Sequence, residues 1–160
     1  MLRDHVLQAL EDVNTLHYKP LWLESKNEKE ELILEVFSFG KIKDVPESLR
    51  CILTALMWTK LRKLTLLDLF CRHRTLNTVN LQTECEMESA LEVEQLAMSL
   101  GKWVDISIDQ VGGEIHVLRC HESRDVYDGE KKLHLVSGVD SRLTLLQDLR
   151  VWKERIEYEL

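Results

Sequence analysis

Hydrophobic residues follow a helical period between residues 60 and 74. The leucines of this stretch recur three or four positions apart and fill one side of a helix. Thr65 stands three residues before Asp68, which is the spacing of a helix-capping box. We therefore expect one helix to end near Thr65. Another should run from there to the basic residues at 72–74, which suit a helix C-terminus.

Two further helices are predicted in the stretch that follows. Asn77 or Thr78 is suited to cap a short helix over Val79–Cys85. Ser89 begins a second capping box, and the apolar residues after it keep helical spacing. Gly101 then ends this helix, because glycine is the residue most often found just past a helix C-terminus.

The period changes from helical to alternating after Gly101. Isoleucine and valine alternate with polar residues on both sides of Gly112-Gly113, and Leu118 is the one break in the alternation. This pattern predicts two strands joined by a tight turn. Three short helices followed by a two-stranded wing is the order of a winged helix, a variant of the helix-turn-helix.

The first 59 residues predict a group of short helices, each with one apolar face. We expect them over Leu2–Leu16, from Ser25 or Asn27 to Gly40, and from Asp44 or Pro46 through Met57. After the wing, Leu133–Val136 is expected to add a short third strand to the sheet.

A last helix is predicted from a cap at Asp140 or Ser141 to the end of the chain. Its apolar residues fall at spacings of four, three and four, which is a heptad-like seam. A stripe of that length is expected to be buried, either on the chain's own helices or in a partner. The residues of this stripe are Leu145, Leu149, Trp152 and Ile156.

Charge argues against DNA as the target of the predicted winged helix. Residues 75–101 contain no Lys or Arg, and they carry five glutamates. The helix that would enter the major groove is therefore acidic, and phosphates would repel it. A protein partner is favoured, although a merely solvated face gives the same pattern. The candidate nucleic-acid patch is a discontinuous basic cluster: Lys60, Arg62, Lys63, Arg72, His73 and Arg74.

Bulk composition narrows the class of protein further. At 160 residues and 44% hydrophobic content, the chain is expected to form one domain with a helical extension. A net charge of −7 disfavours nucleic acid and anionic membranes as partners. The first residues are too acidic for a secretory signal, and no apolar run approaches the ~18 residues of a membrane span. Four widely spaced cysteines are expected to be reduced and mostly buried.

No motif for catalysis or for a cofactor occurs in the sequence. It lacks the H-E-x-x-H and H-x-H patterns of metalloproteases, G-x-S-x-G, the P-loop and G-x-G-x-x-G. Cys71-x-His73 and Cys120-His121 would supply four zinc ligands, but structural zinc sites show tighter paired spacing. We therefore expect no catalytic residue, no metal site and no cofactor.

Several stretches resemble a known family. Lys60–Phe70, Thr75–Met87, the hairpin and Cys120–Tyr127 are similar to the C-terminal half of PCI domains. These are the helical and winged-helix modules of the COP9 signalosome, the proteasome lid and an initiation-factor complex. Within that set the chain resembles signalosome subunits of the seven type. It is more similar still to a short signalosome subunit of budding yeast, with a likeness that extends to Leu16–Asn27, Phe37–Leu49 and Leu149–Trp152.

The resemblance implies a non-catalytic scaffold subunit located in nucleus and cytoplasm. Its complex removes a ubiquitin-like modifier from cullins through another subunit, a metalloprotease. The implied partners are the other PCI subunits and, through them, the metalloprotease, with no nucleic acid and no membrane. Subunits of this kind join through the edges of their wings and gather their C-terminal helices into a shared bundle. The expected binding residues are Ile106, Ser107, Ile108, Ile115, His116 and Val117 in the wing, and Leu145, Leu149, Trp152 and Ile156 in the last helix.

The predicted fold is thus mainly α with a small β wing. A short helical repeat (residues 1–59) precedes a winged-helix, PCI-like subdomain (60–136) and a long C-terminal helix (140–160). Two other functions stay open: a winged-helix nucleic-acid-binding protein or transcription regulator, and a PCI subunit of the proteasome lid or of the initiation factor.

Overall fold

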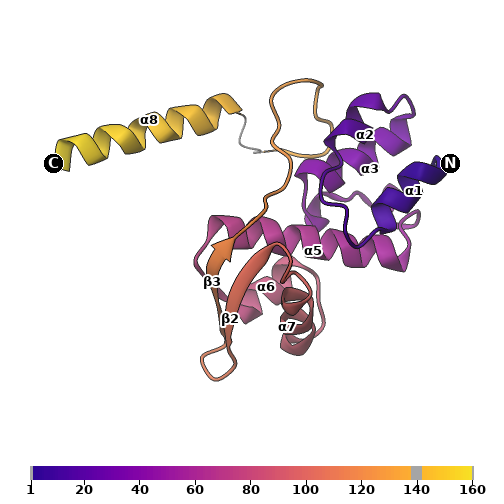
Figure 1. Cartoon of the computed structure of the whole chain (residues 1–160). Coiled ribbons are helices and arrows are strands. Elements are labelled where there is room, and N and C mark those ends of the chain that lie inside the picture. Colours follow the sequence, from indigo (N-terminus) through magenta and orange to yellow (C-terminus); the bar gives the residue numbers. More distant parts are fainter. Residues whose placement is uncertain (1, 138–141, 160) are drawn as a thin grey trace.

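The computed structural model describes residues 2–137 and 142–159 (Figure 1). The N-terminal part consists of α1 (Asp4–Glu11), α2 (Lys19–Glu24), α3 (Glu28–Phe39), the 3-10 turn η1 (Ile42–Asp44) and α4 (Glu47–Arg50). The longer α5 (Ala55–Arg72) leads to β1 (Thr75–Asn77), α6 (Thr78–Glu84), α7 (Ala90–Met98), β2 (Val104–Asp109), β3 (Glu114–Cys120) and α8 (Arg142–Glu159).

The three strands form one antiparallel sheet in the order β1-β3-β2. The hairpin strands β2 and β3 are sequential neighbours, and the short β1 pairs with the far side of β3. The predicted fold class, mainly helical with a small β wing and a C-terminal helix, is confirmed.

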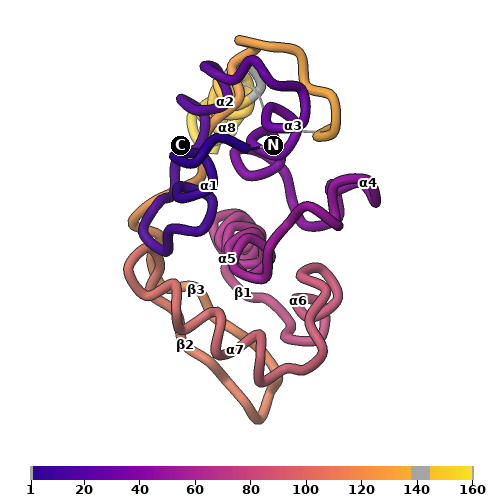
Figure 2. Tube along the Cα trace, turned by 90° about the vertical axis from the view of Figure 1, so that its right-hand side faces the viewer, coloured from indigo at the N-terminus to yellow at the C-terminus, as the bar shows by residue number. Residues whose placement is uncertain are grey.

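Helix α5 is the element on which both halves of the chain pack. Figure 2 looks along its axis, with α1–α3 on one side of it and the sheet with α6 and α7 on the other. It contacts α1 and η1 in the first half, and α7 and β3 in the second. Leu61, Leu64 and Phe70 of α5 are buried in the same apolar cluster as Trp22 and Ile115. Because each large buried side chain stabilises the fold by about 1.5–3 kcal/mol, α5 holds the two halves in one core.

The predicted helix boundary at Thr65 is wrong, because α5 runs through it without a break. The Thr65 hydroxyl donates to the carbonyl of Leu61, one turn earlier, at 2.9 Å, and accepts the amide of Ile42 at 3.2 Å. Threonine can bond back to the preceding turn of its own helix, so its presence does not require a helix start. The side chain instead fixes η1 against α5.

The predicted helix from Asp44 or Pro46 through Met57 is also wrong. Helix α4 ends at Arg50, and a new helix begins after Thr54, whose hydroxyl accepts the amide of Met57 at 3.3 Å. The apolar spacing continued across this boundary, whereas the capping hydroxyl at Thr54 divides it into two helices.

The predicted third strand at Leu133–Val136 is wrong as well. No strand is assigned there, and the third strand is Thr75–Asn77. The amides of residues 134–136 instead donate to one carboxylate oxygen, Oε1 of Glu35, at 2.8, 2.8 and 3.0 Å. A buried carboxylate therefore satisfies backbone donors that a sheet would otherwise have bonded.

The predicted caps at Asn77 and Ser89 and the predicted glycine turn are confirmed. Asn77 and Ser89 cap α6 and α7, since their side chains accept the amides of Val79 and Glu92. Gly113 has φ +65°, the left-handed conformation that glycine adopts without strain, in the turn of the hairpin.

The break in alternation at Leu118 has a structural cause. Asp105 pairs with Arg119 and Ile106 pairs with Val117, so Leu118 has no partner on β2. This is a β-bulge on β3, which bends the strand and lets a side chain leave the regular alternation. Leu118 is accordingly 68% exposed.

Candidate partner-binding surfaces

The wing residues expected to bind a partner lie on two strands with different surroundings. Ile115, His116 and Val117 belong to β3, which is paired on both sides. Ile106, Ser107 and Ile108 belong to β2, which has a neighbouring strand on one side only. Of these two strands, β2 is the one whose backbone can pair with an added strand, and its binding role stays a prediction.

The hydrogen bonds of β3 show which way the backbone of β2 points. The amide of Val117 donates to Arg74 at 2.7 Å, so Val117 faces β1. Because the backbone groups of successive strand residues point to opposite sides, those of His116 face β2, and those of its partner Ser107 on β2 face β3. The backbone N–H and C=O groups of Ile106 and Ile108 then face away from the sheet.

Helix α8 extends away from the body of the protein (Figure 1). Along the stripe, Leu145 is 38% exposed, Leu149 61%, Trp152 66% and Ile156 54%. Leu145, at the start of the stripe, lies against the body of the protein, whereas the other three side chains are more than half exposed. The predicted cap at Asp140 or Ser141 lies outside the described residues.

The connector between β3 and α8 is fastened to the N-terminal helices by Arg124. Its guanidinium is buried and donates to the carbonyls of Gly40, Phe37 and Val36 at 2.5, 2.9 and 3.1 Å. These carbonyls belong to the last turn of α3 and its C-cap residue Gly40, where a helix leaves carbonyl groups that accept bonds from outside it. Burial lowers the pKa of Arg124 to about 10, which leaves the group charged at neutral pH.

Asp125 fastens the same connector to the start of α2. Its Oδ2 accepts the amides of Tyr18 and Lys19 at 2.8 and 3.1 Å, and Oδ1 lies 2.9 Å from Nδ1 of His17. A carboxylate at a helix N-terminus satisfies free amides and the helix dipole together. No local pattern in the sequence points to these roles of Arg124 and Asp125, although both lie in the stretch Cys120–Tyr127 that resembles the family.

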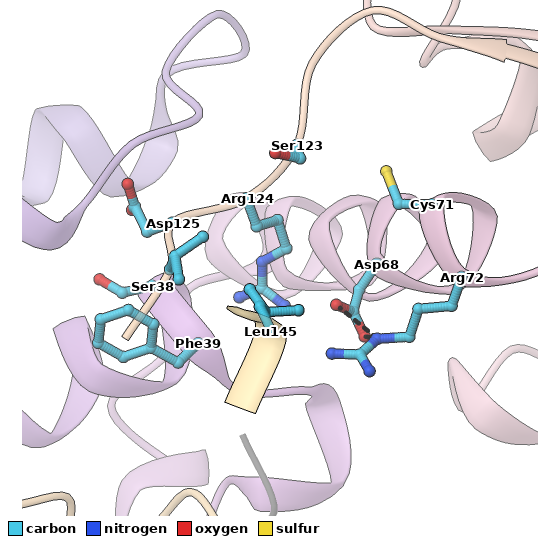
Figure 3. A pocket seen from close by; sticks show the side chains of 10 residues that line it. Ser38, Phe39, Asp68, Cys71, Arg72, Ser123, Arg124, Asp125 and Leu145 are labelled. Carbon is cyan, nitrogen blue, oxygen red and sulfur yellow. Dashed lines mark hydrogen bonds and ion pairs between the residues drawn. The ribbon is translucent and has the colours of Figure 1, made fainter. Parts of the chain in front are cut away.

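A cavity of about 240 Å³ lies where the connector, α3 and α5 meet the start of α8 (Figure 3). Leu145 of α8 lines it together with Phe39 and Arg124. Asp68 on its wall pairs with Arg72, with an Oδ2–Nε distance of 3.3 Å. Asp68 and Arg124 of this cavity are thus engaged in contacts within the fold.

The residues considered as zinc ligands do not form a metal site in the described part of the chain. Within residues 2–137 and 142–159, no three His, Cys, Asp or Glu side chains gather in a way that could hold a metal ion. The expectation of mostly buried cysteines is wrong, because Cys51, Cys71 and Cys120 are exposed and Cys85 is buried. Partial burial of the Cys71 thiol still raises its pKa to about 12, and a hydrogen bond with Cys120 adds to the shift. A thiol with such a pKa is a poor nucleophile at neutral pH. His121 lies 3.0 Å from Asp105 in the wing.

The basic cluster considered for nucleic acid is partly internal. Lys60 is 3% exposed, donates to the carbonyl of Val13 at 3.1 Å, and lies over the ring of Trp103. Arg62 donates to the carbonyl of Glu86 at 3.1 Å. The cluster therefore offers fewer free cations to a phosphate backbone than its sequence suggests. None of the described helices combines the length and the apolar character that a membrane span requires.

Comparison with known proteins finds relatives along the whole chain. It is 36% identical over 166 residues to "COP9 signalosome complex subunit 9" of Eremothecium gossypii, covering 100% of this chain and 99% of the relative. It is 34% identical over 163 residues to the protein of that name in Saccharomyces cerevisiae, with 100% and 98% covered. The protein of that name in Kluyveromyces lactis is 32% identical over 156 residues, with 98% and 99% covered. No family model matches the chain.

Proposed function

The chain belongs to the COP9 signalosome subunit 9 family, and from that premise we propose that it is a non-catalytic scaffold subunit of a signalosome. The observation that carries the proposal is the full-length match to relatives of that name. Their similarity covers the helices, the wing and α8 alike, so it concerns the complete architecture described above. It also agrees with the resemblance of the sequence to a short budding-yeast signalosome subunit.

We assign the region from α5 to β3 as the winged helix of a PCI domain. Its elements follow the order helix, strand, two helices and hairpin, and the first strand closes the sheet beside the hairpin. Short helices precede it, as in a PCI module of abbreviated length. The division into residues 1–59, 60–136 and 140–160, and the relation to subunits of the seven type, are part of this proposal.

As a scaffold, the chain would act by binding neighbours rather than by chemistry. Two surfaces suit that role: the free edge of β2, and the apolar stripe of α8. Burying a large side chain is worth about 1.5–3 kcal/mol, and the stripe of α8 gains little of this on its own chain. Its neighbours would be the other PCI subunits, and through them the metalloprotease that removes the modifier from cullins, in nucleus and cytoplasm.

The alternative of a winged-helix nucleic-acid binder or transcription regulator is less well supported. Helix α7, which would be the recognition helix, carries Glu92 and Glu94 and is preceded by Glu88. Lys60, which belongs to the basic cluster considered for nucleic acid, is buried in the core. A place in the proteasome lid or in the initiation factor would suit the same fold, but the relatives found bear a different name.

Deletion of the gene in its own host tests this function. Cells that lack the chain should accumulate cullin carrying the modifier, and expression of the wild-type chain should restore the unmodified form. The purified chain alone should leave a modifier–cullin conjugate intact. Unchanged cullin in the deletion strain would contradict a role in the signalosome, and cleavage by the isolated chain would contradict a scaffold role.

A further inference from the structure

Polar and apolar residues alternate along strand β2, which has a free edge. Asp105, Ser107 and Asp109 are exposed on the outer face of the sheet, whereas Ile106 and Ile108 are half-buried on its inner face. The free backbone groups of this edge belong to the two isoleucines, as the pairing of β3 shows. An added strand would therefore bond to Ile106 and Ile108.

Within the described residues, no Lys or Arg side chain forms an ion pair with either aspartate of this edge. Asp105 contacts the imidazole of His121 at 3.0 Å, and Asp109 accepts the amide of Gly112 at 2.9 Å. Arg119 is the cross-strand partner of Asp105, yet no salt bridge joins them in the described part of the chain. The charge of both carboxylates is therefore available to a strand placed alongside.

We propose that the free edge of β2 binds an extended partner segment with two basic residues four positions apart and apolar residues at the second and fourth positions. This inference rests on the proposed function, because it specifies the partner of the same edge. Side chains directly opposite one another in a sheet share a face and lie within contact distance. The basic residues would face Asp105 and Asp109, and the apolar residues would face Ile106 and Ile108. The pattern is symmetric, so it holds for a parallel or an antiparallel segment.

A second copy of the chain fits this edge poorly. Antiparallel pairing of two β2 strands about Ser107 would place Asp105 of each copy opposite Asp109 of the other. Like charges directly opposite in a sheet are destabilising, and the net charge of −7 adds long-range repulsion. The same charges keep the edge from aggregating while leaving it open to a cationic strand.

Two nine-residue peptides test the proposal on the intact chain. One carries Lys-Val-Thr-Val-Lys at its centre, and the other carries Glu-Val-Thr-Val-Glu. We expect the lysine peptide to shift the ¹⁵N–¹H resonances of Ile106 and Ile108, and the glutamate peptide to bind at least about fivefold more weakly. The lysine peptide should lose affinity as salt is raised from low to physiological concentration.

Substitutions of carboxylates test whether the preference for the lysine peptide arises from Asp105 and Asp109. Asp105→Asn with Asp109→Asn removes both charges and keeps side-chain acceptors, so it should abolish the preference for the lysine peptide. Glu114→Gln removes a carboxylate from the paired strand β3 and should leave the preference unchanged. Equal binding of both peptides, binding by neither, or shifts confined to other elements would overturn the proposal. Concentration-dependent dimerisation of the chain through β2 would overturn it as well.

The complex distinguishes a failure of this inference from a failure of the proposed function. If the tagged wild-type chain and the Asp105→Asn, Asp109→Asn variant recover the signalosome subunits equally, the inference fails and the function stands. If the wild-type chain recovers none of them, the function fails, and the peptide measurement still decides the preference of the edge.

Discussion

The carboxylate of Glu35 binds the amide of Val136 across 101 positions of the sequence, with an oxygen–nitrogen distance of 3.0 Å. The same oxygen accepts the amides of His134 and Leu135, and Glu35 itself is fully buried on α3. Hydrogen bonds to a charged group are stronger than neutral ones. Glu35 therefore holds the segment that leads to α8 on the N-terminal helices.

Replacing Glu35 should loosen this segment and lower stability. We expect Glu35→Ala to reduce the free energy of unfolding by about 3 kcal/mol, because three amides lose a charged acceptor. Glu28→Ala, an exposed glutamate on the same helix, should cost less than about 1 kcal/mol. Urea unfolding measures both changes, and amide hydrogen exchange should speed up at residues 134–136 in Glu35→Ala alone. Equal effects of the two variants would contradict the role of Glu35.

Lys60 makes stability depend on pH in the alkaline range. Burial lowers its pKa from 10.5 to about 8, with a further lowering by Lys63. At a pH between these two pKa values, the Lys60 amine is mostly protonated in the unfolded chain and mostly deprotonated in the folded chain. The contribution of Lys60 to stability therefore rises with pH. Relative to Lys60→Met, the wild type should gain about 1 kcal/mol between pH 7 and pH 9 in urea unfolding. Parallel pH profiles would show that Lys60 does not titrate differently in the folded state.

The free edge of β2 predicts different outcomes for proline at neighbouring positions. Ile108→Pro removes an outward N–H and should weaken entry into the complex, whereas Ser107→Pro removes a donor of the sheet and should destabilise the chain itself. Ile108→Ala controls for the lost side chain, since it keeps the N–H. Co-purification and circular dichroism separate the two effects. Normal assembly of Ile108→Pro would exclude pairing at this edge.

The stripe of α8 should be needed for assembly and dispensable for folding. Leu149→Asp with Trp152→Asp replaces side chains that are 61% and 66% exposed, so the isolated chain should lose less than about 1 kcal/mol. Entry into the complex should be abolished, because the charges would be buried in the partner. Gln147→Asp with Tyr158→Asp adds two charges on the opposite side of the helix and should leave both properties unchanged. Unfolding of the Leu149, Trp152 variant would place α8 in the chain's own core.

Local signals in the sequence were sufficient for the features that depend on near neighbours. The caps at Asn77 and Ser89, the glycine turn of the hairpin and the stripe of α8 each require residues only a few positions apart. The strand β1 is three residues long, which is too short for alternation to show. Without it, the order of the sheet and hence the free edge could not be predicted.

The predicted helix boundaries were wrong where a residue type occurs both at helix ends and inside helices. A threonine hydroxyl caps α5 at Thr54 but lies within the helix at Thr65, where it bonds to Leu61 and Ile42 instead. The contacts of Glu35 and Arg124 join residues more than 80 positions apart. No local pattern reports such a contact, so the attachment of the connector appeared only in the structure.

Quantitative mass spectrometry of a complex purified through the tagged full-length chain tests the central claim most directly. Membership of a signalosome predicts recovery of its PCI subunits and its metalloprotease subunit at about one copy per copy of the chain. Recovery of proteasome-lid or initiation-factor subunits in their place, or of the chain without any of these proteins, would contradict it.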